Sequence, residues 1–183
     1  MPTRKTVDSN TGSNLRDIIL GGQDGLVNVL GVILAVASAT HDTRVVIIAG
    51  LAATFAESIS MAAVGYTSSK AAKEYYASTA PKRVHRVVID AWENPLRSAL
   101  VIGAAAVVGS LVPLVPFIVL DIGAATIAAL VISTLVLFAT GFVKNKITMG
   151  NPFAGGIEMA SIGMLAALAG YAIGSFLGVA LYA

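Results

Sequence analysis

Hydrophobic residues fall into five long runs that are separated by short polar segments. The runs cover approximately residues 18–39, 45–68, 96–116, 120–143 and 155–182. Each is close to the length of about 20 apolar residues that an α-helix needs to cross a bilayer. None shows the sustained alternation of polar and apolar positions that is typical of a β-barrel wall. The pattern predicts an all-α, polytopic membrane protein with five transmembrane helices.

The polar segments set the limits of this membrane domain. Residues 1–16 are predicted to form a cytoplasmic tail, and residues 17–183 a single five-span domain. The connection 77–94 places charged residues on one helical face and valines with Trp92 nearer the other. This arrangement predicts a short amphipathic helix on the cytoplasmic membrane surface, anchored by Trp92.

Composition agrees with a membrane protein and narrows the chemistry. The chain is 56% hydrophobic and 12% charged, whereas soluble domains average about 45–50% apolar and about 25% charged residues. A net charge of only +2 gives no reason to expect a nucleic-acid partner. Because the chain has no cysteine, any metal ligands must be oxygen, nitrogen or thioether groups.

Basic residues predict the orientation in the bilayer. Of the 12 Lys and Arg residues, all but Arg44 fall in the N-terminal tail and in two connections that lie on the same side. Such segments face the cytoplasm, so the N-terminus is predicted to be cytoplasmic and the C-terminus outside. The chain has no long targeting extension, and we therefore expect a prokaryotic plasma membrane.

Asp24 is the first candidate for function. An ionisable residue at bilayer depth costs about 2.5–3.5 kcal/mol, so it marks a functional site by default. Asp17, Asp24 and Asn28 share one side of the first span, and the glycines around Asp24 let an ion or another backbone approach closely. We predict Asp24 as a metal ligand, with Asn28 beside it. The alternative is that Asp24 only pairs with a neighbouring helix.

Glu57 and Met61 form a second candidate pair in the second span. They lie one helical turn apart on the same face. A carboxylate together with a thioether favours Fe(II), Mn(II) or Co(II) over Mg or Ca. The alternatives are that Glu57 makes a hydrogen bond between helices or exchanges protons, and that Met61 belongs to the core.

Glu158 lies near the cytoplasmic end of the fifth span. It is either a third metal ligand, at the start of an ion path, or an interfacial acid in contact with headgroup water. No Ser-His-Asp grouping, phosphate loop or His-rich motif occurs in the sequence, so an enzyme is not expected. No tightly bound cofactor is expected either, and a metal ion would be the transported substrate.

Four segments together resemble the vacuolar iron transporter (VIT) family. They are DGLVNVLGVILAVASA, ESISMAAVGYTSSKAAKEYY, NPLRSALVIGAAAVVGSLVPLVPF and GGIEMASIGMLAALAGYAIGSFLG. The resemblance implies five spans and a homodimer with the ion path at the subunit interface. It also implies export of Fe(II), and of Mn(II) as a further substrate, from the cytosol in exchange for protons.

Individual residues can also be matched to positions of the family. Asp24 matches the family's first-span aspartate and Met61 its second-span methionine. The family's second-span acid stands where this chain has Ala53, so Glu57 lies one turn closer to the methionine. Glu158 occupies a position that is often basic in relatives.

The connection between the second and third spans departs from the larger family members. They insert an acidic metal-binding domain there, whereas this connection is short and mostly basic. The chain therefore resembles a short prokaryotic-type member that lacks this domain. Besides a metal exporter, two interpretations remain open: a membrane scaffold or sensor subunit that does not transport, and a carrier of protons or small solutes.

Overall fold

The computed structural model describes residues 9–79 and 94–182, and every element in these two ranges is helical. The helices are α1 (Ser9–Thr40), α2 (Thr43–Thr79), α4 (Pro95–Val119), α5 (Ile122–Ile147) and α6 (Pro152–Tyr182). All five are long and apolar enough to cross a membrane. The predicted fold class is confirmed.

Two helices extend beyond the predicted spans. α1 begins at Ser9, so the second half of the segment expected as a tail is helical. α2 continues to Thr79, well past residue 68. Its extension is rich in Ala, Lys and Glu, which favour helix, and Lys70 and Glu74 form an i,i+4 ion pair at 3.9 Å. The predicted amphipathic helix falls mainly on residues 80–93, which lie outside the described residues.

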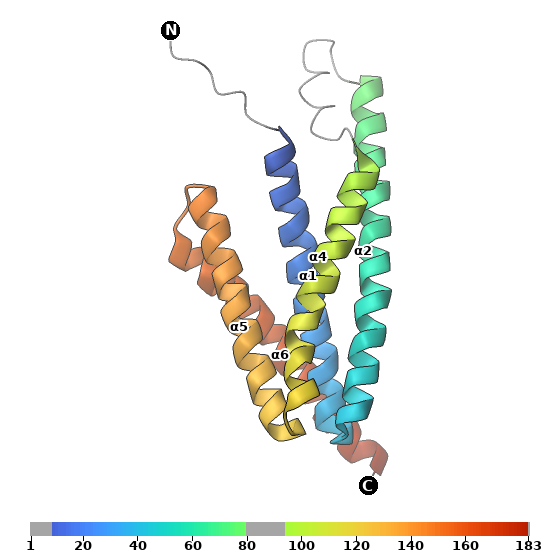
Figure 1. Cartoon of the computed structure of the whole chain (residues 1–183), viewed down its shortest axis with the longest axis vertical. Coiled ribbons are helices and arrows are strands. Elements are labelled where there is room, and N and C mark those ends of the chain that lie inside the picture. The colour runs from blue at the N-terminus through green and yellow to red at the C-terminus, as the bar shows by residue number, and fades with distance from the viewer. Residues whose placement is uncertain (1–8, 80–93, 183) are drawn as a thin grey trace.

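The two ends of the bundle differ in charge. The start of α1, the end of α2, the start of α4 and the α5–α6 turn lie at one end, called the inner end here (Figure 1). The α1–α2 and α4–α5 turns lie at the opposite, outer end (Figure 1). Among the described Lys and Arg residues, Arg44 alone lies at the outer end. The asymmetry expected from the sequence is therefore present in three dimensions.

α1 is the central helix and contacts all four others. Small residues let its backbone approach α4 and α6 closely. Near the inner end, a Cβ on Gly25 would overlap the carbonyl oxygen of Ala106 in α4. Toward the outer end, a Cβ on Gly170 or Gly174 of α6 would overlap the α1 backbone. α1 thus packs on α4 with its first half and on α6 with its second half.

A buried hydrogen bond joins α1 to α4 at the inner end. Asp17 is only 1% exposed. Its Oδ2 accepts a hydrogen bond from Ser98 Oγ at 2.7 Å, and its Oδ1 is 2.6 Å from the Arg16 guanidinium. A buried carboxylate needs such partners, because burying an unpaired charge is costly. Asp17 is therefore explained by packing, although it shares a side of α1 with Asp24.

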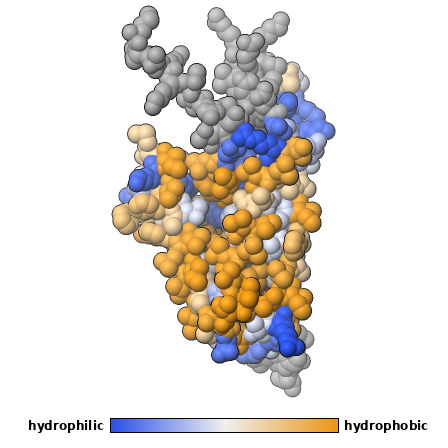
Figure 2. Space-filling view, in the orientation of Figure 1, coloured by the Kyte–Doolittle hydropathy of each residue, from blue (hydrophilic) through white to orange (hydrophobic). Residues whose placement is uncertain are grey.

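The outer surface of the bundle suits a lipid environment. Hydrophobic side chains cover most of the middle of the molecule, and hydrophilic ones gather toward its ends (Figure 2). Large apolar side chains such as Phe55 and Leu135 are more than half exposed. A contiguous apolar surface of this extent is rare on soluble monomers and is expected where acyl chains are the solvent.

Candidate functional site

The candidate site begins with a hydrogen bond between α1 and α2. Asn28 Nδ2 donates to Glu57 Oε1 at 2.6 Å. Asn28 lies 12 residues before Thr40, where α1 ends at the outer side, which is about 18 Å at the helical rise. The hydrocarbon core is about 30 Å thick, so the pair sits close to mid-membrane.

Asp24 joins this pair from the next turn of α1. Its carboxyl group lies close enough to the Glu57 carboxyl group to interact with it electrostatically. Asp24 also borders a hollow of about 210 Å³ toward the inner end, which is lined by Leu20, Gln23, Asp24, Val27 and Ile162. The structure therefore brings together three of the predicted residues: Asp24, Asn28 and Glu57.

Met61 continues the site along α2. It is half-buried and lies one helical turn from Glu57, on the same face and toward the inner end. The sequence spacing predicted this neighbourhood, and the helical geometry of α2 preserves it.

Glu158 stands apart from the other acids. Its side chain is exposed on α6, whereas the neighbouring Met159 is 4% exposed and packs with Leu26 and Leu137. Because Met159 faces inward, the helical period turns Glu158 outward. Within the two described ranges, no three His, Asp or Glu side chains lie close enough to hold one metal ion. Glu158 is nevertheless one turn from Ile162, which lines the hollow beside Asp24.

The site is made of hard oxygen donors and one amide. Asp24 and Glu57 supply carboxylate oxygens, and Asn28 can present either N–H or oxygen to a ligand. In the observed arrangement its N–H group fixes the position of the Glu57 carboxylate. Two carboxylates from one copy are few for a cation, because ions such as Ca²⁺ take six to eight oxygen ligands. The set is a partial coordination shell.

The site is also open at the surface of a single copy. Asn28 is exposed, and Asp24 and Glu57 are only half-buried. Polar groups at this depth face a bundle interior or an aqueous cavity instead of lipid. Something other than acyl chains must therefore cover this face of α1 and α2.

Two residues beside Asp24 were missed by the sequence reasoning. Gln23 lines the hollow, and its polar side chain inside an apolar run is a signal that could have found it. Ile162 lines the same hollow from α6. An isoleucine in an apolar span carries no such signal, and only the packing of α6 beside α1 identifies it.

These features define the class of protein. A membrane-spanning helical bundle that holds carboxylates together near mid-membrane has the construction of a transport protein, since ionisable groups at that depth mark ion and substrate pathways. The model of the VIT family matches residues 15–91 and 82–175. The chain belongs to this family.

Individual relatives come from plants, archaea and yeast. Vacuolar iron transporter 1 of Tulipa gesneriana is 27% identical over 210 aligned residues, which cover 87% of this chain and 85% of that protein. An uncharacterized protein of Methanocaldococcus jannaschii is 30% identical over 159 residues, with 82% and 83% covered. Protein CCC1 of Saccharomyces cerevisiae is 27% identical, with 90% of this chain and 69% of that protein covered.

The lengths of these alignments show how this chain differs in size from its relatives. The alignment with the tulip protein is longer than this 183-residue chain. The tulip protein therefore contains residues that have no counterpart here. The alignment with the archaeal protein needs only 159 positions for 82% of this chain. This chain and the archaeal protein are the shorter form of the family.

Proposed function

We propose that the protein exports Fe(II), with Mn(II) as a further substrate, from the cytosol across the membrane. The observation that carries the proposal is the joining of Asp24, Asn28 and Glu57 near mid-membrane. Membership of the VIT family supports it, as do relatives that are named vacuolar iron transporters. The metal is a transported substrate and not a resident cofactor.

The donor set supports a transition metal. Carboxylate oxygens alone suit Mg, Ca and Mn, whereas a thioether is a soft ligand that Mg and Ca do not favour. Met61 lies one turn from Glu57 on the inner side, so an ion approaching the carboxylates from the inner end meets sulfur first. A path with both donor types favours Fe(II) and Mn(II) over the far more abundant Mg.

Proton exchange follows from the closeness of the two acids. Asp24 and Glu57 repel each other when both are ionised and no cation lies between them. A proton entering as the metal leaves would relieve this repulsion and limit the net charge moved. We therefore propose metal export coupled to inward proton movement, with Glu57 as the exchanging carboxyl group.

The open face of the site supports a homodimer. A second copy placed against α1 and α2 would cover Asn28 and double the number of carboxylates around the ion. The ion path would then run between the subunits, as homo-oligomers with two-fold symmetry allow. The positive charge at the inner end supports a cytoplasmic N-terminus. The membrane that we propose is a prokaryotic plasma membrane.

The dimer can be tested by cross-linking, because the native chain has no cysteine to interfere. Asn28→Cys should form a disulfide-linked dimer on mild oxidation in the membrane, since the two copies of α1 face each other there. Leu135→Cys is the matched control. This exposed residue lies at similar depth on α5 and should remain monomeric. Equal cross-linking at both positions, or none at Asn28→Cys, would place the interface elsewhere.

Transport itself is tested in proteoliposomes under reducing conditions. Fe(II) uptake and movement of protons should appear together and depend on the protein. Proton movement without added metal would favour a carrier of protons or small solutes. A folded protein with no metal or proton flux would reject the exporter and favour a scaffold or sensor subunit.

A further inference from the structure

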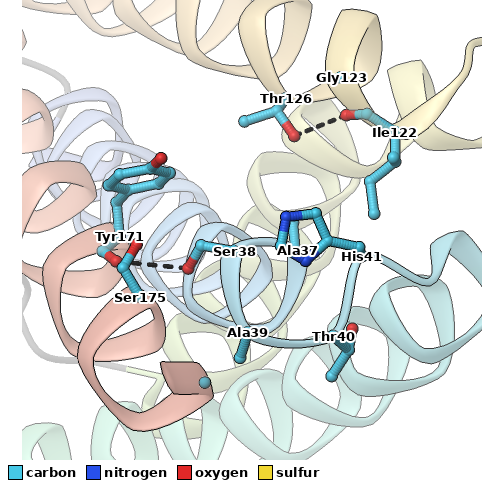
Figure 3. Close-up of a pocket in the computed structure, with 11 residues that line it drawn as sticks. Ala37, Ser38, Ala39, Thr40, His41, Ile122, Gly123, Thr126, Tyr171 and Ser175 are labelled. Atoms are coloured by element: carbon cyan, nitrogen blue, oxygen red, sulfur yellow. Dashed lines mark hydrogen bonds between the residues drawn. The ribbon is translucent and has the colours of Figure 1, made fainter. Parts of the chain in front are cut away.

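A second polar cavity lies at the outer end of the bundle. It has a volume of about 720 Å³ and is formed by the end of α1, the start of α5 and the last turns of α6 (Figure 3). Its lining is unusually polar for an apolar protein: Ser38, Thr40, His41, Thr126, Tyr171 and Ser175 all contribute. Among the residues that the structure describes, no Asp or Glu side chain lines it. It is distinct from the hollow beside Asp24.

His41 is held in place by the backbone of the α1–α2 turn. Its φ is 51°, in the left-handed region that few residues other than glycine adopt. Its N–H donates to the carbonyl oxygen of Ala37 at 3.1 Å, which ends α1. Figure 3 shows the imidazole directed over Ala37 into the cavity, between α1 and the start of α5.

The hydroxyl groups of the cavity offer lone pairs. Ser38 Oγ has one proton to donate and lies within hydrogen-bond distance of two backbone oxygens, that of Ala35 at 3.0 Å and that of Tyr171 at 3.3 Å. Thr126 Oγ1 donates to the backbone oxygen of Ile122 at 2.6 Å. A hydroxyl group that has donated its one proton can only accept or coordinate with what remains. The lone pairs of these two hydroxyl groups are therefore available to a cation.

The cavity lies in line with the mid-membrane site. Asp24, Asn28, Gly31, Ala35 and Ser38 follow each other at steps of four and three along α1, which places them on one face. Between Asn28 and Ser38 this face is covered by glycines of α6. The outer cavity is therefore the next polar space on the same side of α1, and in this conformation α6 separates it from the mid-membrane site.

We propose that this cavity is a low-affinity release site for the exported divalent transition metal, with the His41 imidazole as its nitrogen ligand. The inference rests on the proposed export function. Imidazole suits Fe and related transition metals, and hydroxyl oxygens complete the shell. The lack of carboxylates keeps binding weak, and a site at the end of a path must let its ion leave.

The test uses a unique thiol inside the cavity. Ser175→Cys introduces the only cysteine of the chain, and a membrane-impermeant maleimide reaches it from outside in spheroplasts. We expect a dissociation constant of about 1 mM, in the range of weak extracellular cation sites. Mn(II) at about 10 mM should then slow labelling about tenfold, because it leaves roughly a tenth of the sites empty. Mg(II) at the same concentration should not.

Two further variants isolate the imidazole. His41→Asn and His41→Gly both allow the left-handed turn, so the fold is kept while the nitrogen ligand is lost. Either change, made in Ser175→Cys, should abolish protection by Mn(II). Leu120→Cys, on the adjacent outer turn, should label at one rate with or without Mn(II).

The outcomes separate this proposal from the export function. Protection that persists in both His41 variants, or no protection by Mn(II) in Ser175→Cys, overturns the release site even if transport is intact. If Mn(II) protects Ser175→Cys only when His41 is present, but the protein shows no Fe(II) flux, the cation site is supported. The proposed export function is then rejected.

Discussion

Glu57→Gln is expected to lower Fe(II) transport by about 100-fold while the helical bundle stays folded. The change removes one of two carboxylates near mid-membrane and keeps the shape of the side chain. Mutation of residues that only support metal ligands lowers metal affinity or activity by about 10–100-fold. Loss of a ligand itself should therefore lower transport by an amount at or beyond the upper end of this range. Glutamine can still accept the hydrogen bond from Asn28 Nδ2, which argues against collapse of the α1–α2 contact.

The matched control is Glu74→Gln on the same helix. Glu74 is exposed on the inner extension of α2 and pairs weakly with Lys70, so the same chemical change should leave the transport rate unaltered. Asn28→Ala should lower the Fe(II) transport rate by about tenfold, between the effects of the other two variants, because Asn28 positions Glu57. Initial rates of Fe(II) uptake into proteoliposomes measure all three. A normal rate in Glu57→Gln would exclude Glu57 from the ion path.

Periodicity in the sequence was enough to predict the helices and part of the site. Long apolar runs place the spans, and the i,i+4 relation places Asp24 beside Asn28 and Glu57 beside Met61. These relations hold within one helix, so they need no knowledge of tertiary structure. The end of α2 was predicted less well, because its apolar run stops at the membrane surface, whereas a helix rich in Ala and Lys continues into water. The start of α1 was missed because residues 9–16 are mostly polar and carry no strong helix signal.

Relations between helices could not be derived in this way. Asn28 meets Glu57 because α1 and α2 both pack on α4, which brings the two helices together at this level. The same packing separates Asp17 from Asp24: Ser98 of α4 buries the first acid and leaves the second facing a hollow. Whether the Glu158 side chain is buried or exposed depends on which side of α6 packs into the core, and that side carries Met159.

Gly109→Ala is expected to destabilise the protein by about 3 kcal/mol, the upper part of the range for overpacking. A Cβ at Gly109 of α4 would overlap the carbonyl oxygen of Gly22 in α1 and lie 2.9 Å from its carbonyl carbon. The obstacle is backbone, so no side-chain rotation can relieve it. α1 and α4 would have to separate and lose their neighbouring contact at Gly25.

Gly12→Ala is the control for this substitution, since a Cβ at Gly12 of α1 has no neighbour within 4 Å. There the gain in helix propensity, up to about 1 kcal/mol, should leave stability equal or higher. For Gly109→Ala the unfolding midpoint in detergent should fall by about 6–12 °C, from about 2–4 °C per kcal/mol at this chain length. Because Gly22 and Gly25 flank Asp24, separating the helices should also displace the acid and slow Fe(II) uptake. A midpoint equal to that of Gly12→Ala would show that α1 and α4 do not meet backbone to backbone.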